Sequence, residues 1–311
     1  MFGVNNCVNT WPFRRGERFI NSSFSQHVAL FETAAGALVD VLLLLILPAV
    51  SLFAFLAGQV VFRQSSKAEK FLNTGFGGGM FTTADKIRFD RVFSGNADID
   101  ALLPIYTQSI YTLYGKPGAG KSNIALAYCV TAIQQGHNCV WIDTEGKFPV
   151  SRLEVVTKTR GVADWQSRLF YTRAMSVKDL INAVRMVYKG EVAGKVVVVD
   201  TIINAFRQDP EYQGLRNLAK RQQTLSAILG TLFRAVNRFN STAFTITHSM
   251  ETILGRDKHV GGHVLAHETR LLRVEVGQNS NTRSIITEKI PDMPPISIPF
   301  TICDYGICYT R

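Results

Sequence analysis

The sequence predicts an α/β fold in which a mostly parallel sheet is flanked by helices. Short apolar runs alternate with helical patterns from about residue 92 onwards, and runs such as 196–199 are continuously apolar. Continuous apolar strands joined by helical crossovers are typical of a parallel sheet that is buried on both faces. One run leads into the glycine-rich stretch 115–122, which ends in Lys-Ser and opens a helical pattern. This arrangement indicates a phosphate-binding loop, or P-loop.

The expected strands and helices alternate along the chain. Strands are predicted at 110–114, 139–142, 169–172, 196–199 and 243–247, and helices at 122–135, 150–159, 177–189 and about 218–239. The helix after the P-loop is expected to be amphipathic. Closely spaced strands follow near 270–276, 283–288 and 298–302, with prolines between them. The sheet is therefore predicted to finish in an antiparallel extension.

The chain before the sheet divides into three predicted parts. Residues 1–40 show no convincing period and have no assigned role. Residues 41–62 contain no charged side chain over 22 positions. Such a stretch predicts a transmembrane helix, because it can cross a hydrocarbon core of about 30 Å. Two alternatives stay open, a buried core helix and translated sequence upstream of the true start. Residues 63–91, with four glycines between 75 and 79, are expected to form a linker before the domain at 92–311.

Charge and cysteine usage suggest partners and a compartment. The formal net charge is +10, and residues 81–311 carry +8 of it, which favours acidic partners such as nucleic acid or an anionic membrane surface. An unremarkable basic surface is the alternative. Arg63, Lys67 and Lys70 follow the apolar stretch and would place the C-terminal part on the cytosolic side. The five cysteines contain no C-x-x-C pair, which predicts packing cysteines in a reducing compartment.

The P-loop predicts the binding of a nucleoside triphosphate together with Mg²⁺. Its glycines permit a tight turn that points backbone N–H groups at phosphates, Lys121 reaches the β- and γ-phosphates, and Ser122 offers its hydroxyl to magnesium. An ordinary glycine-rich turn is the alternative, but such a turn rarely falls between a strand and a helix. The predicted nucleotide contacts from this stretch are Gly115, Lys116, Pro117, Gly118, Ala119, Gly120, Lys121, Ser122 and Asn123.

Two carboxylates are candidates for the chemistry at the ends of predicted strands. Asp200 ends a buried valine run, as does the carboxylate that holds magnesium or its water in P-loop proteins. Glu145 follows the strand 139–142, which we expect beside the P-loop, where it can act as general base towards a water in line with the γ-phosphate. The alternative, a helix-capping or solvated acid, explains Asp143 well and Glu145 less well.

Several motifs in order give residues 81–311 a resemblance to a known family, the RecA-type recombinases, in particular the archaeal RadA and RadB branch and its eukaryotic relatives. The matching stretches are FTTA at 81–84, SGNADIDALL at 94–103, the P-loop, DTEGKFPVSRL at 143–153, LAKRQQTL at 218–225, GGHVLAH at 261–267 and IPDMPP at 290–295. The resemblance implies a RecA-like ATPase core and a DNA-dependent ATPase. It also implies an intracellular protein, in cytoplasm or nucleus, that binds single- or double-stranded DNA in homologous recombination and repair.

The resemblance also implies roles for individual residues. Glu145 and Lys121 would be catalytic, Arg152 would pack against the adenine, and Pro291 would cap the nucleotide of an adjacent subunit. Phe81 and Ala84 match the motif by which one recombinase subunit inserts into its neighbour, which implies a homo-oligomer or an assembly with related subunits. The implied DNA-binding residues are Arg216, Lys220 and Arg221 in a first DNA-facing loop, and Arg256 and Lys258 in a second, 250–262.

Departures from the family pattern favour an accessory, RadB-like protein. His248-Ser249 replaces the family's Asn-Gln, which senses the γ-phosphate, and Lys289 replaces an aspartate near a bound cation, whose place its ammonium would take. The alternative function is a membrane-associated regulatory ATPase of the same fold that does not bind DNA. The histidines at 259, 263 and 267 are spaced as metal ligands on a helix would be, although Gly261 and Gly262 interrupt such a helix.

Overall fold

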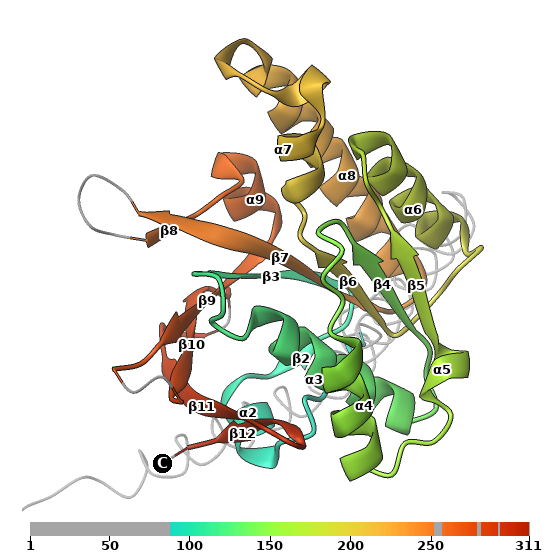
Figure 1. Cartoon of the computed structure of the whole chain (residues 1–311), viewed down its shortest axis with the longest axis vertical. Helices are drawn as coiled ribbons and strands as arrows, with labels where there is room; N and C mark the ends of the chain where they lie inside the picture. The colour runs from blue at the N-terminus through green and yellow to red at the C-terminus, as the bar shows by residue number, and fades with distance from the viewer. Residues whose placement is uncertain (1–87, 252–256, 279–280, 292, 311) are drawn as a thin grey trace, which may run out of the picture. The chain divides into compact units, whose positions relative to one another are not determined.

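The computed structural model describes residues 88–251, 257–278, 281–291 and 293–310 (Figure 1). The predicted membrane segment 41–62, the linker glycines, Phe81, Ala84 and Arg256 lie outside these residues. Within the described ranges, no helix combines the length and the apolar character that a membrane span requires.

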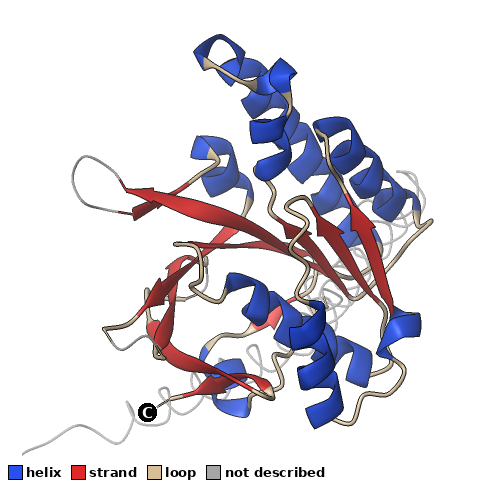
Figure 2. Cartoon of the chain, in the orientation of Figure 1, coloured by secondary structure: helices blue, strands red, loops and turns tan. Residues whose placement is uncertain are grey.

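The described chain forms an α/β domain with the predicted alternation of strands and helices (Figure 2). The strands are β1 (Arg91–Val92), β2 (Ile105–Tyr106), β3 (Ser109–Gly115), β4 (Cys139–Asp143), β5 (Leu169–Arg173), β6 (Val196–Asp200), β7 (Thr242–Glu251), β8 (Asp257–His259), β9 (Arg270–Val276), β10 (Arg283–Lys289), β11 (Ser297–Cys303) and β12 (Gly306–Tyr309). The helices are α2 (Ala97–Leu102), α3 (Lys121–Gln134), α4 (Val150–Thr159), α5 (Trp165–Arg168), α6 (Val177–Lys189), α7 (Asn204–Gln208), α8 (Leu218–Arg238) and α9 (Gly262–Glu268), with short 3₁₀ turns at Pro210–Tyr212 and Leu215–Asn217.

One large sheet organises the described residues. Its strand order is β12-β11-β10-β9-β3-β7-β6-β4-β5, and β8 pairs with the far part of β7. The neighbours from β9 through β3 and on to β5 are parallel, whereas β9 to β12 pair antiparallel. The predicted antiparallel extension at the C-terminal end of the sheet is confirmed.

Alternate residues of the central strands enter two separate cores, as the period of two in a strand requires. In β6, Val196 and Val198 belong to one buried cluster and Val197 and Val199 to the other. Figure 2 shows α3 and α4 on one face of the sheet and α6 and α8 on the other. Because both faces are covered, the strands are apolar without interruption, which is the pattern that predicted the fold.

Two expectations about the elements around the P-loop are wrong. Helix α3 is not amphipathic, since all residues of 124–133 are buried; it lies against the sheet and also packs against α4 and β12. In addition, β4 is not the strand beside β3. Strands β7 and β6 lie between them. Strands that are distant in the sequence pair here, and such pairing leaves no local sequence pattern. The sequence of β4 therefore could not indicate how far Glu145 lies from the P-loop.

The C-terminal hairpin corrects the prediction for two cysteines. Cys303 and Cys308 form a disulfide between β11 and β12, with 6.0 Å between their Cα atoms. The absence of a C-x-x-C spacing did not exclude this pair. A tight hairpin turn brings residues on its two strands into contact even when they are five positions apart in the sequence. Cys129 and Cys139 are free and buried, as predicted for packing cysteines.

Candidate nucleotide-binding site

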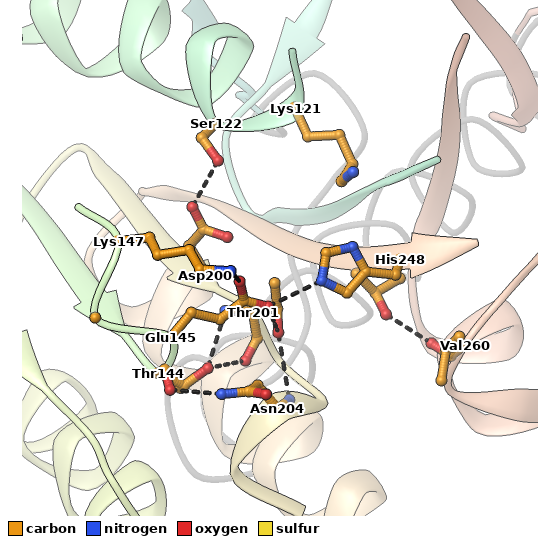
Figure 3. A network of polar contacts seen from close by, with 12 residues as sticks. Lys121, Ser122, Thr144, Glu145, Lys147, Asp200, Thr201, Asn204, His248 and Val260 are labelled. Atoms are coloured by element: carbon orange, nitrogen blue, oxygen red, sulfur yellow. Dashed lines mark hydrogen bonds and ion pairs between the residues drawn. The ribbon is translucent and has the colours of Figure 1, made fainter. Parts of the chain in front are cut away.

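The carboxyl ends of β3, β4, β6 and β7 and the start of α3 surround a cavity of about 230 Å³. This cavity, the nucleotide pocket hereafter, holds most of the residues predicted for nucleotide binding, catalysis and magnesium binding. Its lining is Pro117, Gly118, Gly120, Lys121, Ser122, Asn123, Asp143, Glu145, Lys147, Asp200, Thr201, Ile246 and His248. Figure 3 shows the side chains of Lys121, Asp200, Glu145 and His248 converging on it from different elements.

The loop between β3 and α3 has the backbone geometry that phosphate binding requires. Gly118 and Gly120 have φ values of 79° and 99°, in the left-handed region that glycine adopts without strain. Gly120 is the N-cap residue of α3, and no side chain caps this end of the helix. The N–H groups of the first turn therefore point towards the pocket mouth, and their partial positive charge favours an anion.

Lys121 lies at the centre of this loop with its ammonium group largely buried. Its Nζ donates to the carbonyl oxygens of Gly115 at 2.9 Å and Lys116 at 2.8 Å. Burial lowers the pKa of Lys121 to about 8, against the attraction of Asp200 and Glu145. A phosphate in the pocket would give this ammonium group a negatively charged partner.

Ser122 and Asp200 form the predicted magnesium pair. The Ser122 hydroxyl donates to Oδ2 of Asp200 over 2.7 Å, so two hard oxygen ligands from α3 and β6 meet at one point. Burial raises the pKa of Asp200 to about 6, even though the Ser122 hydrogen bond acts in the opposite direction. A divalent cation would favour the ionised carboxylate, and these residues therefore fit Mg²⁺.

The two carboxylates at the end of β4 and in the turn after it have different tasks. Asp143 fixes the turn, because its Oδ1 accepts the backbone N–H groups of Glu145 at 2.9 Å and Gly146 at 2.8 Å, and its Oδ2 accepts that of Phe148 at 3.2 Å. Glu145 instead points into the nucleotide pocket. Asp143 is thus neither a helix cap nor a solvated acid, because the N-cap residue of α4 is Pro149 with no side-chain cap and Asp143 is buried.

Glu145 is held by three side chains. Its Oε1 lies 2.9 Å from Nε2 of His248 and 3.3 Å from the Thr201 hydroxyl, and its Oε2 lies 3.3 Å from Nζ of Lys147. Burial acts to raise the pKa of Glu145, but the hydrogen bonds and charges of His248 and Lys147 outweigh it and leave that pKa lowered. Glu145 is therefore an ionised carboxylate near neutral pH. Sequence reasoning singled out His248 only as a departure from a family pattern, not as a partner of Glu145.

Five predicted nucleotide contacts lie outside the pocket lining, namely Gly115, Lys116 and Ala119 of the P-loop, Arg152 and Pro291. Arg152 donates through Nε to Asn123 at 3.2 Å and through Nη2 to the Cys303 and Gly306 carbonyls, so it ties α4 to the β11–β12 hairpin. Pro291 is exposed. Its expected role concerns a second subunit.

The two predicted DNA-facing stretches converge on another cavity, of about 690 Å³, which we call the α8–α9 cavity. Arg221 of the first stretch lines it together with Met250 and residues 259–262 of the second. Arg216 is exposed, and Lys220 pairs with Glu211 at 2.9 Å and lies over the Tyr212 ring. Lys258 belongs to β8.

Two further sequence expectations concern this side of the molecule. Lys289 donates to the Ala266 carbonyl near the end of α9. His259 belongs to β8, whereas the histidines at 263 and 267 belong to α9, so the three do not share one helix. No group of three His, Cys, Asp or Glu side chains within the described part of the chain is arranged to hold a metal ion.

The fold and the pocket together define a class of protein. A parallel sheet whose glycine loop, buried lysine and serine–aspartate pair meet at the carboxyl ends of the strands is the arrangement of a P-loop nucleotide-binding protein. Residues 87–310 match the family model described as Rad51. The chain therefore belongs to the Rad51 family of RecA-type recombinases.

Individual relatives agree with this assignment. The chain is 31% identical over 260 residues to the DNA repair and recombination protein RadA of Ignicoccus hospitalis, an alignment that covers 73% of this chain and 77% of the relative. It is 28% identical to the RadA protein of Aeropyrum pernix, over 77% of this chain and 80% of that one. It is 27% identical to the meiotic recombination protein DMC1 homolog of Arabidopsis thaliana, over 77% and 74% of the two chains.

The raised pKa of Asp200 predicts a pH-dependent stability. The folded protein binds this proton more tightly than the unfolded chain, so the free energy of unfolding falls as pH rises from the ordinary pKa of 3.8 to about 6. The asparagine of Asp200→Asn does not titrate and lacks this pH-dependent loss. The free energy of unfolding of Asp200→Asn minus that of the wild type should therefore rise by about 1–3 kcal/mol from about pH 4 to pH 7.

Urea denaturation of the nucleotide-free protein at both pH values measures this difference. Asp304→Asn is the control, because the Asp304 side chain is 77% exposed. A difference between Asp200→Asn and the wild type that does not change with pH would show that the folded protein does not hold the Asp200 proton.

Proposed function

We propose that this protein is an ATP-dependent DNA-binding protein of the Rad51 family that acts in homologous recombination and DNA repair, and that it hydrolyses ATP. The observation that carries the proposal is the convergence of Lys121, Ser122, Glu145 and Asp200 on one pocket, from α3, the turn after β4, and β6. The names of the RadA and DMC1 relatives, which refer to DNA repair and to recombination, support the biological role.

Each of the four side chains has a task that its position allows. Bound Mg²⁺ would neutralise charge on the phosphates, and Ser122 and Asp200 would hold it. Lys121 would leave the carbonyls of Gly115 and Lys116 for the phosphate oxygens, where its ammonium group stabilises negative charge that develops during transfer. Glu145, as an ionised acceptor, would orient the attacking water and take its proton.

DNA binding is supported by charge and by the position of the α8–α9 cavity. The basic excess of +8 falls on residues 81–311. Arg221 and the ends of the 250–262 stretch come together at this cavity although more than 25 residues separate them. The proposed phosphate contacts are Arg216, Lys220, Arg221, Arg256 and Lys258. Single- or double-stranded DNA would pass along the α8–α9 cavity. Strand β7 connects this cavity to the nucleotide pocket, because its residues line both.

Assembly with further subunits is the second part of the proposal. Strand β5 ends the sheet, and within the described residues its outer edge has no paired strand. Beside it lies an apolar pocket of about 420 Å³, lined in part by Phe170, Ala183 and Met186. An unpaired edge next to an apolar pocket suits an extended segment that inserts one ring. We propose that Phe81 and Ala84 of a neighbouring subunit, or of a related recombinase, occupy this place.

The departures at His248-Ser249 and Lys289 favour an accessory, RadB-like role over a main strand-exchange enzyme. The uncharged stretch 41–62 supports a second candidate, a membrane-associated regulatory ATPase of the same fold that does not bind DNA. Both candidates keep the ATPase site and an intracellular location, in cytoplasm or nucleus, or tethered to a membrane with the ATPase on the cytosolic side. They differ in whether DNA is a ligand.

Two substitutions separate binding from hydrolysis. Glu145→Gln should retain nucleotide binding and lower kcat by about 10²–10⁴-fold, because the amide cannot accept the proton of water. Lys121→Ala should lower kcat and also weaken nucleotide binding, because it removes the cation from the phosphate site. Phosphate release and equilibrium binding of a fluorescent ATP analogue are the measurements. Hydrolysis by Glu145→Gln at the wild-type rate would refute its assignment as the base.

The oligomer proposal predicts an effect at either partner surface. Phe81→Glu should give smaller particles in light scattering, since burial of such a ring contributes roughly 1.5–3 kcal/mol. Ala183→Glu, on the pocket beside β5, should have the same effect from the other side. Met175→Glu is the control, because Met175 is exposed and does not line that pocket. Particle sizes that match those of the wild type for both variants would contradict the assembly proposal.

DNA binding should depend steeply on salt. Each phosphate contact on single-stranded DNA contributes about −0.7 to the slope of log affinity against log salt, because counterions are released. Arg256→Ala combined with Lys258→Ala should make this slope shallower and weaken binding to all sequences alike. Nucleotide binding by the same variant is the control and should be unchanged. A protein that hydrolyses ATP but shows no salt-dependent DNA binding would favour the membrane-associated alternative.

A further inference from the structure

His248 lies where the phosphate loop and the DNA-facing hairpin meet. It pairs in register with Gly115, the last residue of β3, which places it next to the P-loop. Beyond it, β7 continues to Glu251 and pairs with β8. The carbonyl oxygen of His248 accepts the backbone N–H of Val260 over 2.9 Å, and the hydroxyl of Thr247 donates to the Val260 carbonyl over 2.9 Å. The backbone of His248 is therefore fixed from both sides.

The imidazole of His248 is the strongest fixed contact of Glu145. Its Nε2 lies 2.9 Å from Oε1, and the two side chains are only 26% and 15% exposed. Lys147 lies farther away, at 3.3 Å, and its side chain is 80% exposed, so water screens and loosens that pair. Thr201 offers a neutral hydroxyl at 3.3 Å.

The other charged groups of the nucleotide pocket are engaged elsewhere. Lys121 donates to loop carbonyls, Asp200 accepts from Ser122, and Asp143 accepts from its own turn. Of the charged or titratable groups that line this pocket, His248 and Lys147 are therefore the ones whose hydrogen bonds hold Glu145. Figure 3 shows the His248 ring approaching Glu145 from the β7 side.

The ionised state of Glu145 fixes which nitrogen carries a proton. An ionised carboxylate accepts hydrogen bonds only, so Nε2 must be the donor, whether or not the ring is charged. The other nitrogen, Nδ1, is buried and has no hydrogen-bond partner among the described residues. The two nitrogens therefore have separate roles, and the Nε2 role is to hold the carboxylate.

We propose that His248 is a positioning residue for Glu145: its Nε2–H holds the carboxylate towards the attacking water and links its orientation to the β7–β8 hairpin. This inference rests on the proposed ATPase function. It assigns to His248 a contact with the proposed base.

The substitutions His248→Gln and His248→Asn test this assignment, because each amide side chain can place a nitrogen near only one of the two imidazole nitrogens. Glutamine places its amide nitrogen near the position of Nε2, whereas asparagine reaches only the position of Nδ1. His248→Asn should lower kcat roughly ten- to a hundredfold with little change in KM, because the base is misplaced while binding is intact. His248→Gln should restore kcat to within a few-fold of the wild type. Equal melting temperatures of the two variants control for folding.

A double substitution shows whether His248 acts through Glu145. If it does, adding His248→Asn to Glu145→Gln should cause no further loss in single-turnover hydrolysis. The proposal would be overturned if His248→Asn kept the wild-type kcat, or if the two losses were fully additive in the double variant. It would also be overturned if His248→Gln lowered kcat as much as His248→Asn does, or if only His248→Gln lowered kcat. A wild-type protein that binds but does not hydrolyse ATP would instead refute the proposed function on which the inference depends.

Discussion

The register of four neighbouring parallel strands is the constraint on which the site depends. Gly115 of β3 pairs with His248 of β7, and Asp200 of β6 pairs with Ile246 of β7 and with Asp143 of β4. The carboxyl ends of these strands therefore form one row under the P-loop. A slip by one residue would turn every side chain of a strand to the opposite face, so burial of both faces fixes this row in place. The two buried cores are thus what positions the chemistry.

The nucleotide pocket has an unfavourable charge arrangement until a ligand enters it. Burial shifts the pKa of Lys121 down and the pKa of Asp200 up, so both groups are driven towards their neutral forms. Phosphates and Mg²⁺ would reverse both effects, because each supplies the opposite charge to the group that it meets. Ligand binding would therefore stabilise the fold as well as prepare the reaction. Glu145 differs from these groups, since His248 and Lys147 keep it ionised without a ligand.

Local patterns predicted the elements well. Helices at 150–159 and 177–189 were located to the residue. In the structure, Ser176 and Asp179 form a capping box at the start of the second helix, and Gly190 ends it in the left-handed region. The P-loop and the position of Glu145 at the nucleotide pocket could be inferred from strand ends and spacing. Strand order could not, because pairing between distant segments has no local pattern. For the same reason the insertion of β7 beside β3, the His248–Glu145 contact and the Cys303–Cys308 disulfide are seen only in the structure.

We propose that one pocket hydrolyses ATP and that DNA, bound near the hairpin that continues from β7, influences this hydrolysis. The most direct measurement is steady-state ATP turnover by the full chain with Mg²⁺, with and without single-stranded DNA. The account predicts measurable turnover without DNA and a higher kcat when DNA is present. Turnover that DNA leaves unchanged, or no turnover in either condition, would contradict it.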